Sequence, residues 1–181
     1  MPTKPKSSRI TIEELASAIE SEDWLLVRFQ MMKRYSKQKP SAEAIPLLCL
    51  ALEDSYHGTV KCAAKSLRKL GPQAVDAINS LLAAAVKLDK FGMPQAYPHC
   101  VEAMAAMAAI APRHPQLLSL IRHHSTRYNN WVPISYSLRA LKTIGTDEAN
   151  IVLREIAEFW EPELNKMQRR VVHQLLTDAS K

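Results

Sequence analysis

The chain has 181 residues, which is enough for one domain with a buried core. Its 24 Lys and Arg residues outnumber its 18 Asp and Glu residues, and the formal net charge of +6 suits nucleic acid or acidic protein partners without deciding between them. A low glycine count and the lack of alternating β-branched runs argue against a β-sheet fold and favour helices.

The sequence shows neither a secretion signal after Met1 nor an apolar run long enough to cross a bilayer. Its three cysteines, Cys49, Cys62 and Cys100, have no paired spacing. An odd number of cysteines in such a chain is typical of reduced thiols. We therefore expect a cytoplasmic protein that does not associate with a membrane.

Residues 1–10 are basic and nearly free of apolar side chains, which predicts a disordered tail. Thr11 and Glu14 then form the pattern of a capping box at the start of the first helix. A second helix is expected over residues 24–36. Because terminal repeats are often atypical, we interpret residues 11–39 as an N-terminal capping pair.

The helix expected over residues 59–70 sets the pattern of the rest of the chain. Gly71 suits the end of that helix and Pro72 the start of the next, which is expected over 73–88. A two-helix unit cannot bury both of its faces alone, so further copies are expected. The apolar stripe of the first helix recurs 40 and 74 residues later, at Val60, Ala64, Leu67 and Leu70, then Cys100, Met104, Met107 and Ile110, then Ile134, Leu138, Leu141 and Ile144.

Spacings of this size are typical of helical solenoids, in which helix pairs stack into an extended array. No linker divides the chain, so we expect a single all-α domain over residues 11–181 with about five helix pairs. The pairs that follow the capping pair are expected at 41–54 with 59–70, 73–88 with 97–111, 114–126 with 131–144, and 147–160 with 162–178.

The same residues resemble a known family, the HEAT repeat, including the variant found in phycobilisome lyases. The resemblance covers about residues 41–178 and implies a right-handed α-α superhelix, a HEAT-like solenoid. It departs from the pattern at Lys61, where the family often has Arg, and at Ser135 in the later copy. It rests on Leu52-Glu53-Asp54, Val60-Lys61, Ala63-Ala64, Leu67, Gly71 and the run Leu141–Ala149.

The helix expected over residues 97–111 is apolar on nearly every side. Such a helix is normally buried all round, which would make it the central core helix of the array. The alternative is a groove of Ala and Met side chains that accepts a helix from a partner, since Met side chains adapt to varied ligands.

The sequence contains no recognisable catalytic or metal-binding motif. It lacks a Gly-rich phosphate loop, a nucleophile elbow and a His-Glu-x-x-His pattern, and none of its six histidines lies four residues from another. We therefore predict no catalytic residue, no metal site and no cofactor.

Cationic side chains lie off the apolar stripe on two of the expected second helices, and the last helix adds Lys166, Arg169 and Arg170. In HEAT-like arrays the second helix of each pair lines the concave side, where cations would attract phosphates or an acidic protein. The middle helix interrupts this surface with Val101, Ala105 and Ala108, and a solvated face without function is the alternative interpretation. We call this surface the basic face; its residues are Lys61, Lys65, Arg68, Arg139 and Lys142.

Aromatic residues gather in the longer turns within the helix pairs, where cations accompany them. Such a composition is typical of interface anchors and base-stacking platforms, and the alternative is that the rings pack between adjacent repeats. We call this surface the turn edge; its residues are Tyr56, Phe91, Tyr97, Arg127, Tyr128, Trp131 and Trp160.

These features predict a non-enzymatic scaffold that binds a protein partner through its concave face or its turn edge. The alternative function is nucleic-acid binding through the basic face. A lyase- or glycosylase-like enzyme is a third hypothesis, which rests on the resemblance to HEAT families with those activities.

Overall fold

The computed structural model describes residues 9–21, 25–86, 98–127 and 131–177, which form helices and turns without any strand. The all-α class expected from the sequence is therefore confirmed. The helices are α1 (Ile12–Glu20), α2 (Leu25–Tyr35), α3 (Ile45–Leu52), α4 (His57–Leu70), α5 (Ile78–Val86), α6 (Pro98–Ile110), α7 (Leu117–Arg127), α8 (Trp131–Ile144), α9 (Asp147–Trp160) and α10 (Lys166–Thr177). Three short 3-10 segments are η1 (Ala42–Ala44), η2 (Gly71–Ala77) and η3 (Glu161–Glu163).

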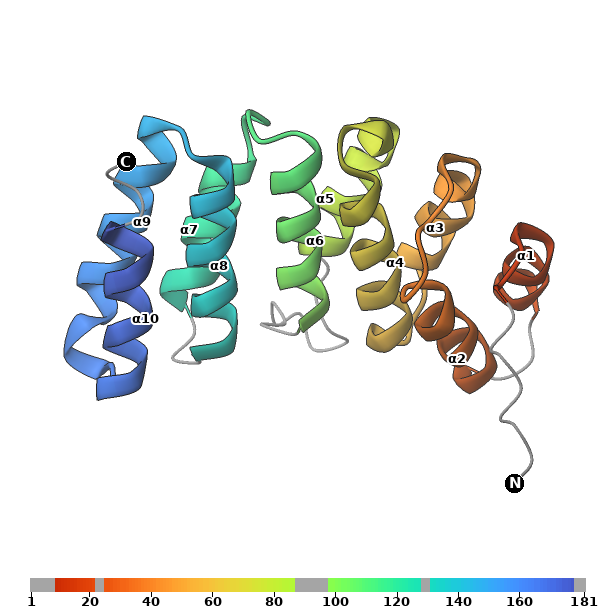
Figure 1. Ribbon diagram of the computed structural model, residues 1–181, viewed down its shortest axis with the longest axis horizontal. Helices are drawn as coiled ribbons and strands as arrows, with labels where there is room; N and C mark the ends of the chain where they lie inside the picture. Colours follow the sequence, from red (N-terminus) through yellow and green to blue (C-terminus); the bar gives the residue numbers. More distant parts are fainter. Residues whose placement is uncertain (1–8, 22–24, 87–97, 128–130, 178–181) are drawn as a thin grey trace, which may run out of the picture.

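The helices lie side by side along the long axis of the molecule, from α1 near the N-terminus to α9 and α10 near the C-terminus (Figure 1). Contacts between helices divide this row into two layers. The helices α2, α4, α6, α8 and α10 contact one another in succession and form what we call the second-helix layer. In the first-helix layer, α1 contacts α3, α3 contacts α5, and α7 contacts α9.

Three helix ends show why the breaks fall where they do. The Thr11 hydroxyl accepts a hydrogen bond from the Glu14 amide at 3.2 Å, and the Thr11 amide donates to the Glu14 carboxylate at 2.9 Å, which confirms the capping box. Gly71 ends α4 with φ +57°, a left-handed conformation that favours glycine. The Thr146 hydroxyl accepts from the Ala149 amide at 3.2 Å and caps α9.

Two helices begin later than the sequence predicted. Residues 71–77 form η2, so α5 begins after them rather than at residue 73. Pro162 lies in η3 instead of the first turn of α10. The last helix begins after Asn165, because Asn165 and Gln168 form a reciprocal cap in which each side-chain oxygen accepts from the other's amide, at 2.9 and 3.0 Å.

Residues 9 and 10 belong to the folded part, although the sequence predicted a tail over 1–10. Ile10 is 4 % exposed, and it exchanges two hydrogen bonds with the Gln38 side chain, at 3.0 and 2.9 Å. A backbone held on both its amide and its carbonyl cannot behave as a free tail. The expected tail therefore shortens to residues 1–8, which lie outside the described part of the chain.

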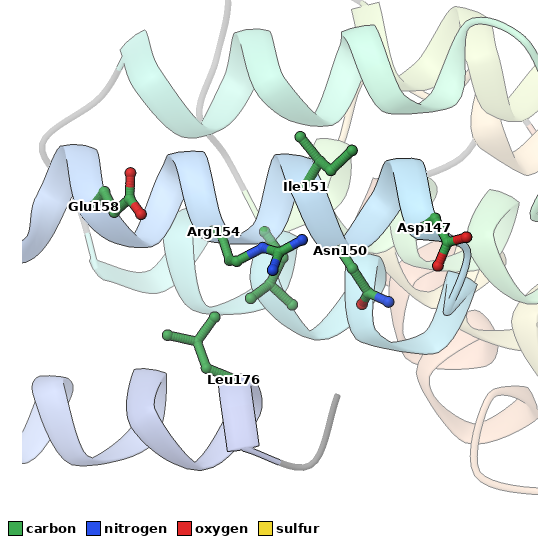
Figure 2. A pocket seen from close by; sticks show the side chains of 7 residues that line it. Asp147, Asn150, Ile151, Arg154, Glu158 and Leu176 are labelled. Atoms are coloured by element: carbon green, nitrogen blue, oxygen red, sulfur yellow. The ribbon is translucent and has the colours of Figure 1, made fainter. Parts of the chain in front are cut away.

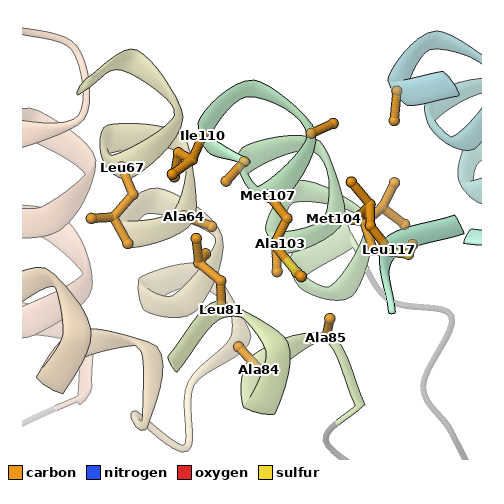
Figure 3. Packing of buried hydrophobic residues seen from close by; sticks show 14 of the residues in the cluster. Ala64, Leu67, Leu81, Ala84, Ala85, Ala103, Met104, Met107, Ile110 and Leu117 are labelled. Atoms are coloured by element: carbon orange, nitrogen blue, oxygen red, sulfur yellow. The ribbon is translucent and has the colours of Figure 1, made fainter. Parts of the chain in front are cut away.

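Helix α6 occupies the centre of the core and contacts α4, α5, α7 and α8. Its Met104 and Met107 side chains are 1 % and 0 % exposed. Figure 3 shows them among Leu67 of α4, Leu81 of α5 and Leu117 of α7. The central-core interpretation is confirmed for this helix, and the alternative of an open Ala and Met groove is wrong, because neighbouring helices already cover these side chains.

Candidate functional site

Charge is divided unequally between the two layers. The helices of the second-helix layer contain twelve Lys and Arg residues and a single carboxylate, Glu102. The helices of the first-helix layer contain seven carboxylates, all in α1 and α9, and three arginines. The cations of the second-helix layer are Arg28, Lys33, Arg34, Lys61, Lys65, Arg68, Lys69, Arg139, Lys142, Lys166, Arg169 and Arg170.

The α4 part of the basic face is a single stripe, because Lys61, Lys65 and Arg68 are spaced four and three residues apart. All three are half-buried, so their aliphatic stems lie along the surface while their charged ends reach solvent. Lys33 of α2 joins them, since Lys33, Lys61 and Lys65 all lie within electrostatic range of Cys62. The structure thus gathers three ammonium groups from α2 and α4.

The thiol beneath these ammonium groups is not an activated nucleophile. Burial raises the pKa of Cys62 above its ordinary value, although the Ser36 side chain and the three lysines act in the opposite direction. Burial also raises the pKa of Cys49. Both thiols therefore stay protonated near neutral pH, and Cys49, Cys62 and Cys100 are all free of disulfides.

Arg68 pairs with a residue that the sequence analysis did not single out. Arg68 Nη1 lies 2.9 Å from Glu102 Oε1 of α6, and the Glu102 side chain is only 4 % exposed. A buried carboxylate without a partner is strongly unfavourable, so Arg68 neutralises Glu102 and joins α4 to α6. The signal that could have revealed Glu102 is its position as the one charged residue of an apolar helix.

The α8 part of the basic face consists of Arg139, which is exposed, and Lys142, which is half-buried. Neither residue forms an ion pair within the described residues. Helix α6 lies between α4 and α8 and presents the half-buried Ala105 at the position equivalent to Lys65 and Arg139. The basic face therefore consists of two cationic groups that are separated by one helix without Lys or Arg.

Trp160, expected on the turn edge, is instead part of the core. Its side chain is 7 % exposed, and its indole Nε1–H donates a hydrogen bond of 2.6 Å to the backbone oxygen of Ser125. This bond joins the end of α9 to α7 in the neighbouring pair. Trp160 thus joins adjacent helix pairs. Of the two interpretations of the turn-edge rings, internal packing fits Trp160 and a partner-binding anchor does not.

Tyr56 is 40 % exposed, and its ring packs edge to face against Phe29 of α2, with 5.0 Å between the ring centroids. Both rings approach Gly58, where an added Cβ would lie 2.5 Å from Tyr56 and 2.7 Å from Phe29. The backbone amide of Tyr56 donates to the Asp54 carboxylate at 2.7 Å. The ring of Tyr56 is therefore held in place against α2, and only part of it faces solvent.

The remaining turn-edge residues are either half-buried or outside the described part of the chain. Trp131 is half-buried and packs against the hydrophobic core. Phe91, Tyr97 and Tyr128 lie outside the described residues, as does the side chain of Arg127. In the described part of the chain, the structure does not bring the turn-edge rings together into one exposed cluster.

A groove of about 590 Å³, lined by polar and apolar side chains alike, runs along α9 beside α10. Figure 2 shows that Asp147, Asn150, Arg154 and Glu158 project from α9, while Leu176 comes from α10. These α9 residues alternate in charge along the helix surface, which is typical of a solvated outer face. Among the described lining residues there is no Ser, Thr, Cys, His or Lys, so the groove has no hydroxyl or thiol nucleophile beside a histidine or lysine base.

A second groove, of about 550 Å³, lies on α10 at the C-terminal end of the row. Its floor is apolar, formed by Leu164, Val172 and Leu176, and Lys166 and Arg170 stand at its rim. The described residues contain no cluster of three or more side chains suited to holding a metal ion. None of the described helices combines the length and apolar character needed to cross a bilayer.

A scan against protein-family models and a search of curated proteins give no match to this chain.

Proposed function

We propose that this chain is a non-enzymatic, HEAT-like α-solenoid that binds an anionic macromolecule through its second-helix layer. The observation that carries the proposal is the separation of charge between the layers, with twelve cations and one buried, paired carboxylate on the second helices. Asp54 and Glu161, in adjoining segments, pair with Arg28 and Arg169, and the other cations remain in excess. Such an excess attracts polyanions over distances of about 8–10 Å at physiological salt.

The HEAT-like part of the proposal is supported by the repeated core positions. Leu67, Met107 and Leu141 are spaced as the repeat requires, and each is fully buried in a helix of the second-helix layer. The right-handed superhelix implied by the resemblance belongs to this proposal. Stacked pairs would hold the side chains of the basic face at fixed spacing, so little ordering entropy would be lost on binding.

The basic face is preferred over the turn edge as the binding surface. The turn-edge rings in the described part of the chain, Trp160, Tyr56 and Trp131, are engaged within the protein. Lys61, Lys65 and Arg139 keep their charged ends available, because none of them forms an ion pair within the described residues. A protein partner with an acidic surface and a nucleic acid both match this charge.

Titration calorimetry with a heparin fragment, a polyanion of known charge, tests the proposal. We expect binding that weakens as salt is raised and that Arg139→Glu reduces. The matched control is Arg154→Glu, which makes the same charge change at an exposed arginine of α9 in the first-helix layer. Equal losses in the two variants would show that net charge alone attracts the polyanion, and the proposal would fail.

A further inference from the structure

The central part of the second-helix layer offers charge without apolar anchors. In the described residues of α4 and α6, no large apolar side chain is exposed. Protein partners gain most of their binding energy from aromatic and aliphatic anchors that fill pockets. The apolar groove on α10 lies at the end of the row, two helices beyond α6. On α8, Val132 is 48 % exposed, but it lies seven residues, or about 10 Å, from Arg139. The centre of the layer therefore suits a ligand that is recognised mainly by charge.

The same surface has few rings free for the stacking that single-stranded nucleic acids need. Tyr56, directly before α4, is 40 % exposed, but its ring is held against Phe29 of α2. Trp131 and Tyr136 of α8 are half-buried, and the half-buried Phe29 of α2 is covered by Tyr56 and by Lys33, whose Nζ lies 5.6 Å from the ring centroid. Proteins that bind single strands stack the bases on exposed rings, and each stacked base contributes about 1–3 kcal/mol. Without such stacking, affinity depends on the density of phosphates.

We propose that the anionic partner is double-stranded nucleic acid, held through its phosphates without base contacts. This inference rests on the proposed function and names its ligand. A duplex carries one negative charge per about 1.7 Å of its axis, roughly twice the density of one of its strands. A surface whose centre, in the described residues of α4 and α6, exposes no large apolar side chain relies on its cations and therefore favours the duplex.

The two-part form of the basic face fits a duplex that lies across the helices, along the row. Packed helices lie about 9 Å apart, so α4 and α8, with α6 between them, are separated by roughly 18 Å. Lys61 and Lys65 would meet phosphates on one side of a groove, and Arg139 and Lys142 would meet phosphates on the other side. The neutral surface of α6, which includes Ala105, would face the groove itself, whose width is about 12 Å for the major groove of DNA.

The number of contacts sets the expected salt dependence. Lys33, Lys61, Lys65, Arg139 and Lys142 give five cations outside the ion pairs of the described residues. Release of counterions from five phosphates predicts that log K falls against log salt with a slope of about −4 to −5. Arg68 is left out of this count because Glu102 already neutralises it.

Fluorescence anisotropy with a labelled duplex of mixed sequence, and with one of its strands, tests the inference. We expect the duplex to bind at least about tenfold more tightly than the strand, in line with the difference in charge density. Arg139→Glu should lower duplex affinity about tenfold and make the salt slope shallower by about 1, whereas Arg154→Glu should change neither. Lys65→Glu is a second variant on the other cationic group, and circular dichroism of each variant confirms that it is folded.

The outcomes separate this inference from the proposed function. Equal or tighter binding of the single strand would overturn the preference for a duplex. Binding of polyglutamate that depends on Arg139, with no binding of the duplex, would overturn nucleic acid as the partner and leave the anionic-partner function standing. If neither polymer binds at low salt, both proposals are wrong.

Discussion

Replacing Trp160 with alanine tests whether this ring packs between helix pairs or anchors a binding partner. Trp160 is 7 % exposed, so the substitution removes a large buried ring and the hydrogen bond to Ser125. Removing a buried aromatic side chain typically costs about 3–5 kcal/mol. For a chain of this size, each kcal/mol lowers the melting temperature by about 2–4 °C, so we expect a fall of roughly 6–20 °C.

Two matched variants divide this effect into its parts. Trp160→Phe keeps a ring but leaves the Ser125 carbonyl without its donor, so we expect a loss of about 1–3 kcal/mol. Phe159→Ala removes the neighbouring ring, which is 56 % exposed and packs edge to face on Trp160, so we expect a loss of at most about 1.5 kcal/mol. Urea denaturation, with the slope compared between variants, measures all three changes.

The same variants also test where the partner binds. If Trp160 joins repeats, Trp160→Phe should leave heparin binding unchanged at a temperature where the variant is folded. A Trp160→Ala protein with wild-type stability and lost binding would mean that the ring faces the partner, and the structural assignment of Trp160 would be wrong.

Two further sets of substitutions and one labelling experiment test single features of the structure. Arg68→Gln should lower the free energy of unfolding by about 2 kcal/mol, because Glu102 is left buried without its cation. The loss is limited because water can still reach the Arg68 site, whose side chain is 37 % exposed. Glu102→Gln in the same chain should recover part of this loss in a double-mutant cycle. Gly71→Ala should lower the free energy of unfolding by about 1–2 kcal/mol, because alanine is strained at a φ of +57°. No atom lies within 4 Å of the added Cβ, so the backbone strain is the whole effect, and thermal unfolding measures this loss. Burial raises the pKa of the Cys62 thiol, so its alkylation should be slow at about pH 8.5, where an ordinary thiol is half ionised. The alkylation rate should increase only as the pH rises further. Labelling of Cys62 at the rate of a free thiol would contradict this prediction.

The repeated core was predictable from the sequence because its signals are local. A residue such as Leu67 recurs at fixed spacing, and Gly71 marks the end of its helix, so periodicity and helix-end chemistry place the pairs without knowledge of contacts. The start of α10 differs from the prediction because Pro162 is a strong start signal, whereas the helix begins at the reciprocal cap of Asn165 and Gln168. A cap of this kind can be found from sequence.

The roles of individual side chains were harder to predict because they depend on neighbours far along the chain. Trp160 points toward Ser125, 35 residues earlier, and Arg68 pairs with Glu102, 34 residues later. Spacing along one helix shows which residues share a face, but it does not show what packs on that face. The turn edge therefore looked like one surface in the sequence, although Trp160 and Tyr56 pack on different helix pairs.

The interruption of the basic face follows from the same packing that builds the core. Helix α6 has neighbours in both layers, so nearly every one of its positions is buried, and a cation at Val101 or Ala108 would lose its hydration without gaining a partner. The one charge that α6 carries, Glu102, is tolerated because Arg68 reaches it from α4. A central helix of this kind cannot take part in a continuous cationic stripe, so a duplex lying along the row as proposed would be held from both sides of α6. Variants on α4 and on α8 should therefore weaken binding independently, and their effects on log K should add.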